Sequence, residues 1–192
     1  PLIAGNWKMH GSRAENAEVI EALLLGVPDQ MPFDIAVCPP FVYLWEVARL
    51  LKASSVGLGA QSVCAEQVGA FTGEASAAML KDVGCKYVIV GHSERRAIYK
   101  EDDALVARKF LACQSQGLIP ILCVGETLEE RERGQTMQVV SRQLTAVLDL
   151  EWSRRSWIHC DLEILLAIAE DPRPLAAADY EHLLDAAAFP GV

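Results

Sequence analysis

The sequence lacks the features that mark several large classes of protein. Its 192 residues hold no Gly-x-Gly-x-x-Gly after the first apolar run and no Gly-Lys-Ser/Thr phosphate loop, which argues against dinucleotide and nucleoside triphosphate sites. No apolar run approaches the roughly 20 residues that span a membrane. Leu2–Ala4 is too short for the apolar part of a secretory leader. We therefore expect neither a membrane segment nor a leader.

Basic residues and reactive cysteine patterns are also scarce. The chain has 17 Lys and Arg against 26 Asp and Glu, a net charge of −9, which argues against nucleic acid and anionic membranes as partners. The six cysteines form no Cys-x-x-Cys pair and have no metal-ligand spacing, so no metal site is expected. Most have apolar neighbours, as Cys38 and Cys123 do, which indicates reduced, buried thiols in a cytoplasmic protein.

Apolar runs alternate regularly with helical patterns up to residue 150. The runs that predict strands are Leu2–Trp7, Asp34–Cys38, Val56–Ala60, Tyr87–Val90 and Ile119–Val124. The stretches that predict helices are Ser12–Leu25, Leu44–Lys52, Ala75–Val83, Asp102–Gln116 and a long helix from Thr127 to about Leu150. Such β/α repeats indicate a parallel sheet with right-handed crossovers. Their spacing fits either a (β/α) barrel or an open doubly wound sheet.

The chain changes character after residue 150. Residues 151–192 contain no clear further β/α unit. Asp161–Glu170 and Ala176–Phe189 are rich in Ala and Leu and predict helices. We therefore expect two regions, a partial barrel over residues 1–150 and a helical tail over residues 151–192. Because the predicted sheet has five strands, its first and fifth strands should have open edges unless the tail covers them.

The strand Tyr87–Val90 ends in a cluster of titratable residues. Gly91 frees the backbone to turn, and His92, Ser93 and Glu94 follow at once. Polar groups at the carboxyl end of a buried parallel strand are typical of catalytic sites. His92 is either a structural residue or, at a helix amino terminus, a neutral hydrogen-bond donor. Glu94 is either an acid/base group or the ion-pair partner of a nearby cation.

Two further segments have alternative interpretations. At the end of the first strand, Asn6 and Lys8 share one face because side chains alternate. Lys8 is either a lysine that reaches solvent or a cation for an anionic substrate. The loop Ala70–Glu74 exposes Phe71, so it is either an ordinary surface loop or an arm that contacts another chain.

These segments together resemble the triosephosphate isomerase family. The matching stretches are Ala4–Met9, Cys38–Pro40, Gly59–Gln61, Gly69–Glu74, Val90–Arg96 and Cys123–Thr127. The resemblance covers residues 1 to about 150. It implies a (β/α) barrel fold and, without a cofactor, the interconversion of dihydroxyacetone phosphate and glyceraldehyde 3-phosphate through an enediolate, a step of glycolysis and gluconeogenesis.

The resemblance also assigns roles to residues of this chain. It implies that His92 polarises the substrate carbonyl, that Lys8 stabilises the oxyanion and the phosphate, and that Glu94 supports the site. Asn6 and Ser93 join Lys8 in binding substrate. A homodimer is implied through Gln61 and the loop residues Phe71, Thr72, Gly73 and Glu74, with Thr72 bracing the partner's site.

One part of the family pattern has no counterpart here. The family's base lies in a Tyr-Glu-Pro-Val-Trp segment after the sixth strand, and the phosphate is held by glycine-rich turns after the seventh and eighth strands. Neither feature occurs in residues 151–192, and Glu163 lacks the flanking residues that would assign it the role of base. No general base is therefore identified. The alternative to an isomerase is a catalytically inactive fragment that acts only as a binding or oligomerising domain.

Overall fold

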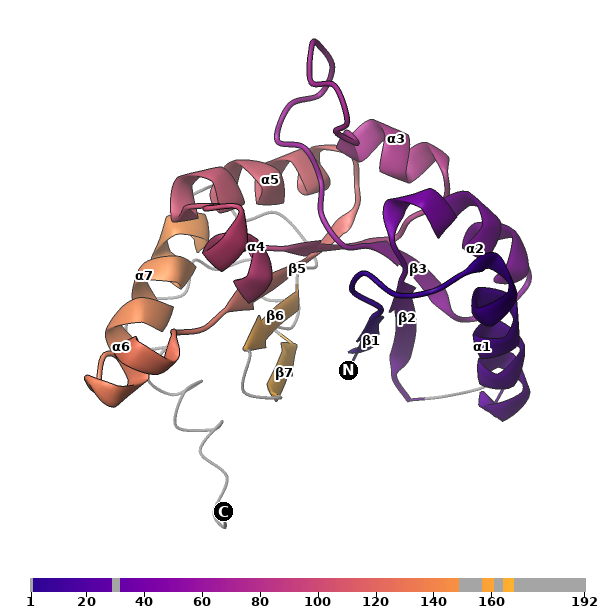
Figure 1. The fold of residues 1–192 in the computed structure, drawn as a ribbon, viewed down its shortest axis with the longest axis horizontal. Helices are drawn as coiled ribbons and strands as arrows, with labels where there is room; N and C mark the ends of the chain where they lie inside the picture. Colours follow the sequence, from indigo (N-terminus) through magenta and orange to yellow (C-terminus); the bar gives the residue numbers. More distant parts are fainter. Residues whose placement is uncertain (1, 29–31, 149–156, 161–163, 168–192) are drawn as a thin grey trace.

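The protein forms one curled sheet with helices packed on its outer side (Figure 1). The computed structural model describes residues 2–28, 32–148, 157–160 and 164–167. The strands are β1 Leu2–Asn6, β2 Asp34–Cys38, β3 Gly57–Ala60, β4 Tyr87–Val90, β5 Ile119–Val124, β6 Trp157–Cys160 and β7 Ile164–Ala167. They lie in the order β1 to β7; each neighbouring pair up to β6 is parallel, whereas β7 is antiparallel to β6. This arrangement is a partial (β/α) barrel, as the sequence predicts.

The helices follow the strands in the alternation expected for β/α units. They are α1 Arg13–Gly26, the 3₁₀ turn η1 Phe41–Tyr43, α2 Leu44–Leu50, α3 Ala77–Asp82, α4 Ser93–Ile98, α5 Asp103–Ser115, α6 Leu128–Glu132 and α7 Thr136–Leu148. Polar side chains cap several of their amino ends. Ser12 accepts the backbone N–H of Glu15 at the start of α1, and Asp102 accepts that of Leu105 at the start of α5. Such caps satisfy N–H groups that have no partner within the helix.

The central strands β2 to β5 are largely buried on both faces, whereas Ile3 of β1 is 53% exposed. The outer face packs against the helices through residues such as Val88, Leu122 and Phe110. The inner face carries a second apolar cluster of Leu2, Ala36, Cys38, Tyr87, Ile89, Ile121 and Cys123. Burial on two faces explains why these strands read as continuous apolar runs.

Buried cysteines contribute to both clusters. Cys38, Cys64, Cys85, Cys113 and Cys123 are buried free thiols. Burial raises the pKa of Cys38, Cys85 and Cys113 to about 12. These three thiols are therefore kept in the unreactive protonated form.

Two expectations from the sequence are wrong. The single helix expected from Thr127 to Leu150 is broken into α6 and α7, because Gly134 adopts a left-handed conformation with φ of 68°. The helix expected over Asp161–Glu170 is wrong at Ile164–Ala167, which form β7. A short apolar run does not distinguish a strand from a buried helix, and here pairing with β6 decides.

The additional strands change the edges of the sheet. The sequence predicts an open edge at the fifth strand unless the tail covers it, and residues 157–160 of the tail do cover it: as β6 they pair with β5 from Ile121↔Trp157 to Val124↔Cys160. β7 contacts β1 as well as β6. The predicted helix over Ala176–Phe189 lies outside the described residues.

Candidate functional site

The carboxyl ends of β1 and β4 bring the predicted site residues together. Gly91 follows β4 with φ of 76°, a conformation that residues with a side chain rarely adopt. This turn places His92 at the cap position before α4, as expected for a histidine that opens a helix. The His92 side chain is largely buried, with 14% of it exposed.

One hydrogen bond shows which ring nitrogen of His92 acts as a hydrogen-bond acceptor. The backbone N–H of Glu94 donates to His92 Nδ1 over 3.2 Å, so Nδ1 presents a lone pair. In the neutral ring the proton therefore lies on Nε2. The Glu94 carboxylate also lies 3.6 Å from Nδ1. An ion pair between them would require a proton on Nδ1, but Nδ1 already accepts the backbone N–H of Glu94. His92 is thus arranged to donate a hydrogen bond from Nε2.

Lys8 is held in a strained backbone conformation just beyond β1. Its φ is 50°, a left-handed value that costs a non-glycine residue about 1–3 kcal/mol and is typical of functional sites. The Lys8 N–H donates to Asn6 Oδ1 over 3.0 Å. Gln61 Nε2 donates to the Lys8 carbonyl and to the Cys38 carbonyl, both over 2.8 Å. These bonds hold the strained residue from both sides.

An ion pair joins the two strand ends. Lys8 Nζ lies 2.9 Å from Glu94 Oε1, with 52% and 45% of the two side chains exposed. The sequence left the partner of Glu94 open; in the structure it is Lys8, while Arg95 pairs with Glu101 and Arg96 with Asp103. The Lys8 ammonium lowers the pKa of Glu94, chiefly by its hydrogen bond, and partial burial opposes this shift.

This lowered pKa predicts a small loss of stability in acid. A carboxylate with a lowered pKa stabilises the fold above its unfolded pKa of about 4.3, and that contribution disappears as the pH falls through the folded value. Because the pair is about half exposed, the effect should be below about 1 kcal/mol. Urea unfolding at pH 7 and pH 3.5 should show that Glu94→Gln loses less stability on acidification than the unaltered chain. An identical loss in both proteins would contradict the ion pair.

A second carboxylate at this edge is already engaged. Glu126 follows β5 and accepts hydrogen bonds from Arg131 Nε over 2.7 Å and from Thr136 Oγ1 over 3.1 Å. Burial raises its pKa, but the hydrogen bonds from Arg131 and Thr136 outweigh burial, and the net shift is downward. Glu126 therefore anchors α6 and α7 and is a poor candidate for a base. Glu163 lies outside the described residues.

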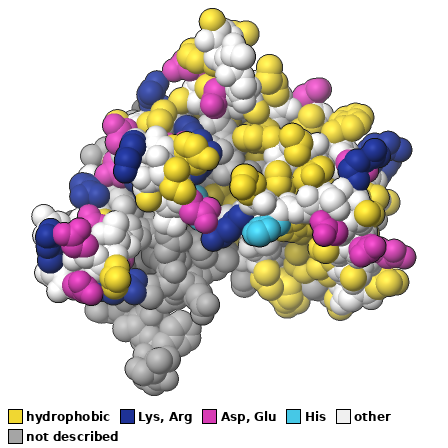
Figure 2. All heavy atoms as spheres, viewed as in Figure 1, with side chains coloured by type: hydrophobic (Ala, Val, Ile, Leu, Met, Phe, Trp, Pro, Cys, Tyr) yellow, Lys and Arg dark blue, Asp and Glu magenta, His cyan; other side chains and the backbone are white. Residues whose placement is uncertain are grey.

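The predicted loop after β3 protrudes from the molecule (Figure 1). Phe71, Thr72, Gly73 and Glu74 are exposed at its end, and Gly73 turns the chain with φ of 94°. Figure 2 shows hydrophobic side chains on this projection and on the surface below it. At and beside the loop, Val68 is 87% exposed and Phe71 46% exposed. The loop is thus a prominent projection that carries exposed apolar side chains.

Gln61 has a contact that the sequence did not predict. The resemblance assigns it to the interface with a second chain, and in the structure its amide also donates to the carbonyls of Lys8 and Cys38. The two-residue period of a strand, which places Gly59 and Gln61 on one side, is the signal that could have linked Gln61 to the site. Ser93, the first residue of α4, is exposed beside His92.

Comparison with known proteins identifies relatives over this region. The family model described as triosephosphate isomerase matches residues 1–158. The chain is 57% identical over 147 residues to the triosephosphate isomerase of Dechloromonas aromatica and 60% identical over 147 residues to that of Thiobacillus denitrificans. Each alignment covers 77% of this chain, with 59% and 58% of the respective relative. The chain therefore spans less than two thirds of the length of these relatives.

A solved structure has a similar fold. The crystal structure of triosephosphate isomerase from Bartonella henselae matches with a TM-score of 0.78 at 38% sequence identity. The match covers 83% of this chain and 67% of that chain.

Proposed function

Because the chain belongs to the triosephosphate isomerase family, we propose that it binds a triose phosphate between Lys8 and His92 and serves the interconversion of dihydroxyacetone phosphate and glyceraldehyde 3-phosphate. The observation that carries this proposal is the constellation at the strand ends, where Glu94 lies 2.9 Å from Lys8 Nζ and its N–H fixes the His92 ring. Such a site presents one cation and one neutral donor, which suits an anionic substrate with a carbonyl group. We also propose a place in glycolysis and a cytoplasmic location, which the free buried thiols support.

The described residues have distinct parts in the proposed reaction. His92 Nε2–H donates to the substrate carbonyl oxygen, and the Lys8 ammonium stabilises the negative charge that develops there and on the phosphate. Asn6 fixes the backbone of Lys8. Removal of the proton from carbon needs a base, and both Glu94 and Glu126 are held by cations. The reaction thus has its electrophile among the described residues, whereas its base is not identified there.

Turnover of glyceraldehyde 3-phosphate tests the proposal. A positioned acid or base contributes about 10²–10⁴-fold, so we expect the chain to be slower than a complete family member by a factor of this order. The control is His92→Gln, purified identically to reveal contaminating host isomerase. Turnover that disappears in His92→Gln supports an assembled site. Equal traces in both preparations would contradict catalysis and favour the alternative, an inactive binding or oligomerising domain.

We further propose that the loop of residues 69–74 mediates a homodimer. The exposed apolar side chains of Val68 and Phe71, which are 87% and 46% exposed, support this proposal, because monomers rarely expose contiguous apolar surface of this kind.

Thr72→Arg is expected to weaken association at least about tenfold, since a charge would be introduced into the apolar contact. Sedimentation velocity over a concentration series measures this effect, with the exposed substitution Glu129→Arg as control. Equal association of the Thr72→Arg variant and the unaltered chain would contradict a dimer through this loop.

A further inference from the structure

A buried charged cluster lies beside the site and takes no part in the proposed chemistry. Glu101, in the connection between α4 and α5, is 5% exposed, and Lys109 of α5 is 4% exposed. Glu101 Oε1 lies 2.5 Å from Lys109 Nζ and 2.6 Å from Arg95 Nε. Glu101 Oε2 is buried and has no hydrogen-bond partner among the described residues. One carboxylate oxygen thus holds two cations from different helices.

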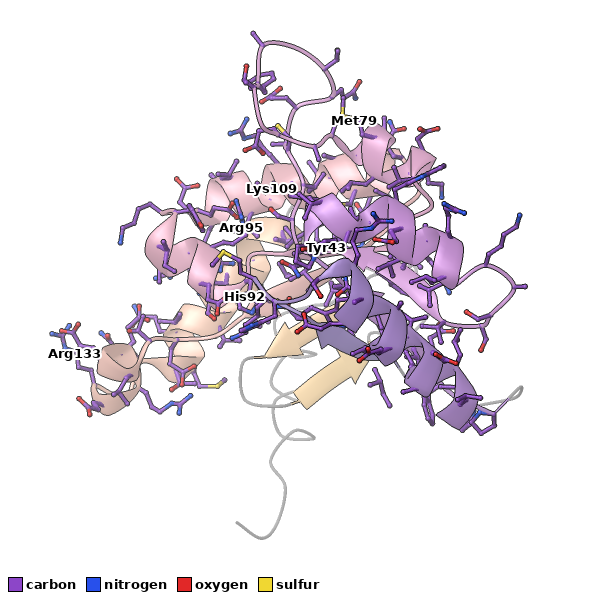
Figure 3. The ribbon with its side chains drawn as sticks, turned by 45° about the vertical axis from the view of Figure 1, so that its right-hand side comes forward. Tyr43, Met79, His92, Arg95, Lys109 and Arg133 are labelled. Atoms are coloured by element: carbon purple, nitrogen blue, oxygen red, sulfur yellow. The ribbon has the colours of Figure 1, made fainter. Side chains whose placement is uncertain are left out.

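One arm of the cluster reaches His92. Arg95 lies in α4, and its N–H donates to the His92 carbonyl over 2.9 Å. The N–H of Glu101 donates to the Arg95 carbonyl over 3.3 Å, so Arg95 is held by both its side chain and its backbone. In Figure 3, the labelled residues Lys109, Arg95 and His92 follow one another downward near the middle of the view. The cluster therefore fixes the helix that begins at the catalytic histidine.

The other arm reaches Lys8. Lys109 Nζ also donates to Ser62 Oγ over 3.2 Å, and Ser62 is buried. Ser62 directly follows Gln61, whose amide holds the strained backbone of Lys8 through its carbonyl. Lys109 thereby anchors the chain segment that holds Lys8 in place.

We propose that Glu101 is a positioning residue that fixes the separation of His92 from Lys8. Replacing a buried ion pair with apolar residues is often neutral or favourable for stability, so stability alone does not explain a buried lysine and a partly buried arginine on one oxygen. The connections explain it. Through Arg95, Glu101 holds the helix that begins after His92. Through Lys109, it holds Ser62, the neighbour of the Gln61 that bonds the Lys8 carbonyl. The ion pair between Lys8 and Glu94 closes this path on the exposed side.

The test compares two glutamates that pair with adjacent residues of α5. Glu101→Gln removes the buried carboxylate charge but keeps the side-chain shape. Glu66→Gln is the matched control, because Glu66 pairs with Arg108 over 3.0 Å at an exposed position. The first readout is the ¹⁵N spectrum of the His92 ring, assigned with His92→Gln, which reports its hydrogen bonding without any ligand. The second is the affinity for phosphoglycolate, an anion that resembles the enediolate.

We expect Glu101→Gln to shift the His92 ring nitrogens and to weaken phosphoglycolate binding about 3- to 30-fold, a usual range for coupling between linked sites. Glu66→Gln should change neither readout. A lowered melting temperature with unchanged His92 nitrogens would overturn the proposal and leave the cluster a purely structural role. If Glu101→Gln does not fold, Arg95→Met leaves the buried pair of Glu101 and Lys109 intact, and unchanged His92 nitrogens in this variant would equally overturn the proposal.

The ligand readout rests on the proposed function, whereas the spectroscopic readout does not. Failure of the unaltered chain to bind phosphoglycolate would therefore count against the proposed function alone. The His92 nitrogens would still decide the role of Glu101.

Discussion

Replacing Gly91 with alanine is expected to lower the free energy of unfolding by about 2–5 kcal/mol. Two costs add. The φ of 76° is left-handed, and a residue with a side chain loses about 1–2 kcal/mol there. A Cβ at this position would also lie 2.9 Å from Val106 Cγ1 and 3.2 Å from the Cys123 carbonyl, and such overpacking costs about 1–3 kcal/mol.

Comparison with a second glycine distinguishes the conformational cost from the overpacking cost. Gly134 has a similar φ of 68°, but a Cβ there would meet no atom within 4 Å. Gly134→Ala should therefore lose only the conformational part, about 1–2 kcal/mol. Urea unfolding of both variants provides the comparison. Equal losses at Gly91 and Gly134 would show that the turn before His92 has room for a side chain and is not closely packed.

Lys8→Met is expected to weaken phosphoglycolate binding about 10- to 100-fold, because hydrogen bonds to charged groups contribute about 1.5–3 kcal/mol. Methionine keeps much of the length of the lysine stem but removes the ammonium. The substitution also releases Glu94 from its 2.9 Å contact, which leaves an unpaired carboxylate beside the anion site. Both consequences act in the same direction, against the binding of an anion.

The control for Lys8→Met is Lys86→Met, which changes the net charge of the chain equally. Lys86 precedes β4, at the end of the sheet opposite the site, and it pairs with Asp34 over 3.8 Å. Its side chain is 48% exposed, close to the 52% of Lys8. Isothermal titration calorimetry on the two variants should show a loss at Lys8 only. Equal losses would indicate that the overall charge of the chain governs anion binding, which would contradict a site at Lys8.

Local sequence patterns account for much of the first five strands and their helices. The apolar run at the start of the chain marked β1, and Gly91 marked the turn that puts His92 before α4. Thr127, where the sequence predicts that a helix starts, forms a capping box with Glu130 at the start of α6. These features depend on residues within a few positions of one another, so the chain itself encodes them.

Contacts between distant residues were not predictable in the same way. The sequence left open which cation pairs with Glu94, and the structure shows that it is Lys8, 86 positions away, because β1 and β4 end at the same edge of the sheet. The apolar residues Ile164–Ala167 became a strand because β6 was available as a partner. The resemblance assigned Gln61 to the interface, whereas its bonds to the carbonyls of Lys8, after β1, and Cys38, at the end of β2, emerged only from the fold.

The sequence by itself determined the β/α order, the turn at Gly91 and the residue types at the strand ends, because each follows from local backbone preferences and from the alternation of side chains. Only the tertiary structure decided how those residues combine. The Lys8–Glu94 pair, the hold of Gln61 on Lys8 and the Arg95–Glu101–Lys109 cluster each join segments that the curled sheet brings together. Their geometry depends on the register and curvature of the whole sheet, which no local pattern specifies.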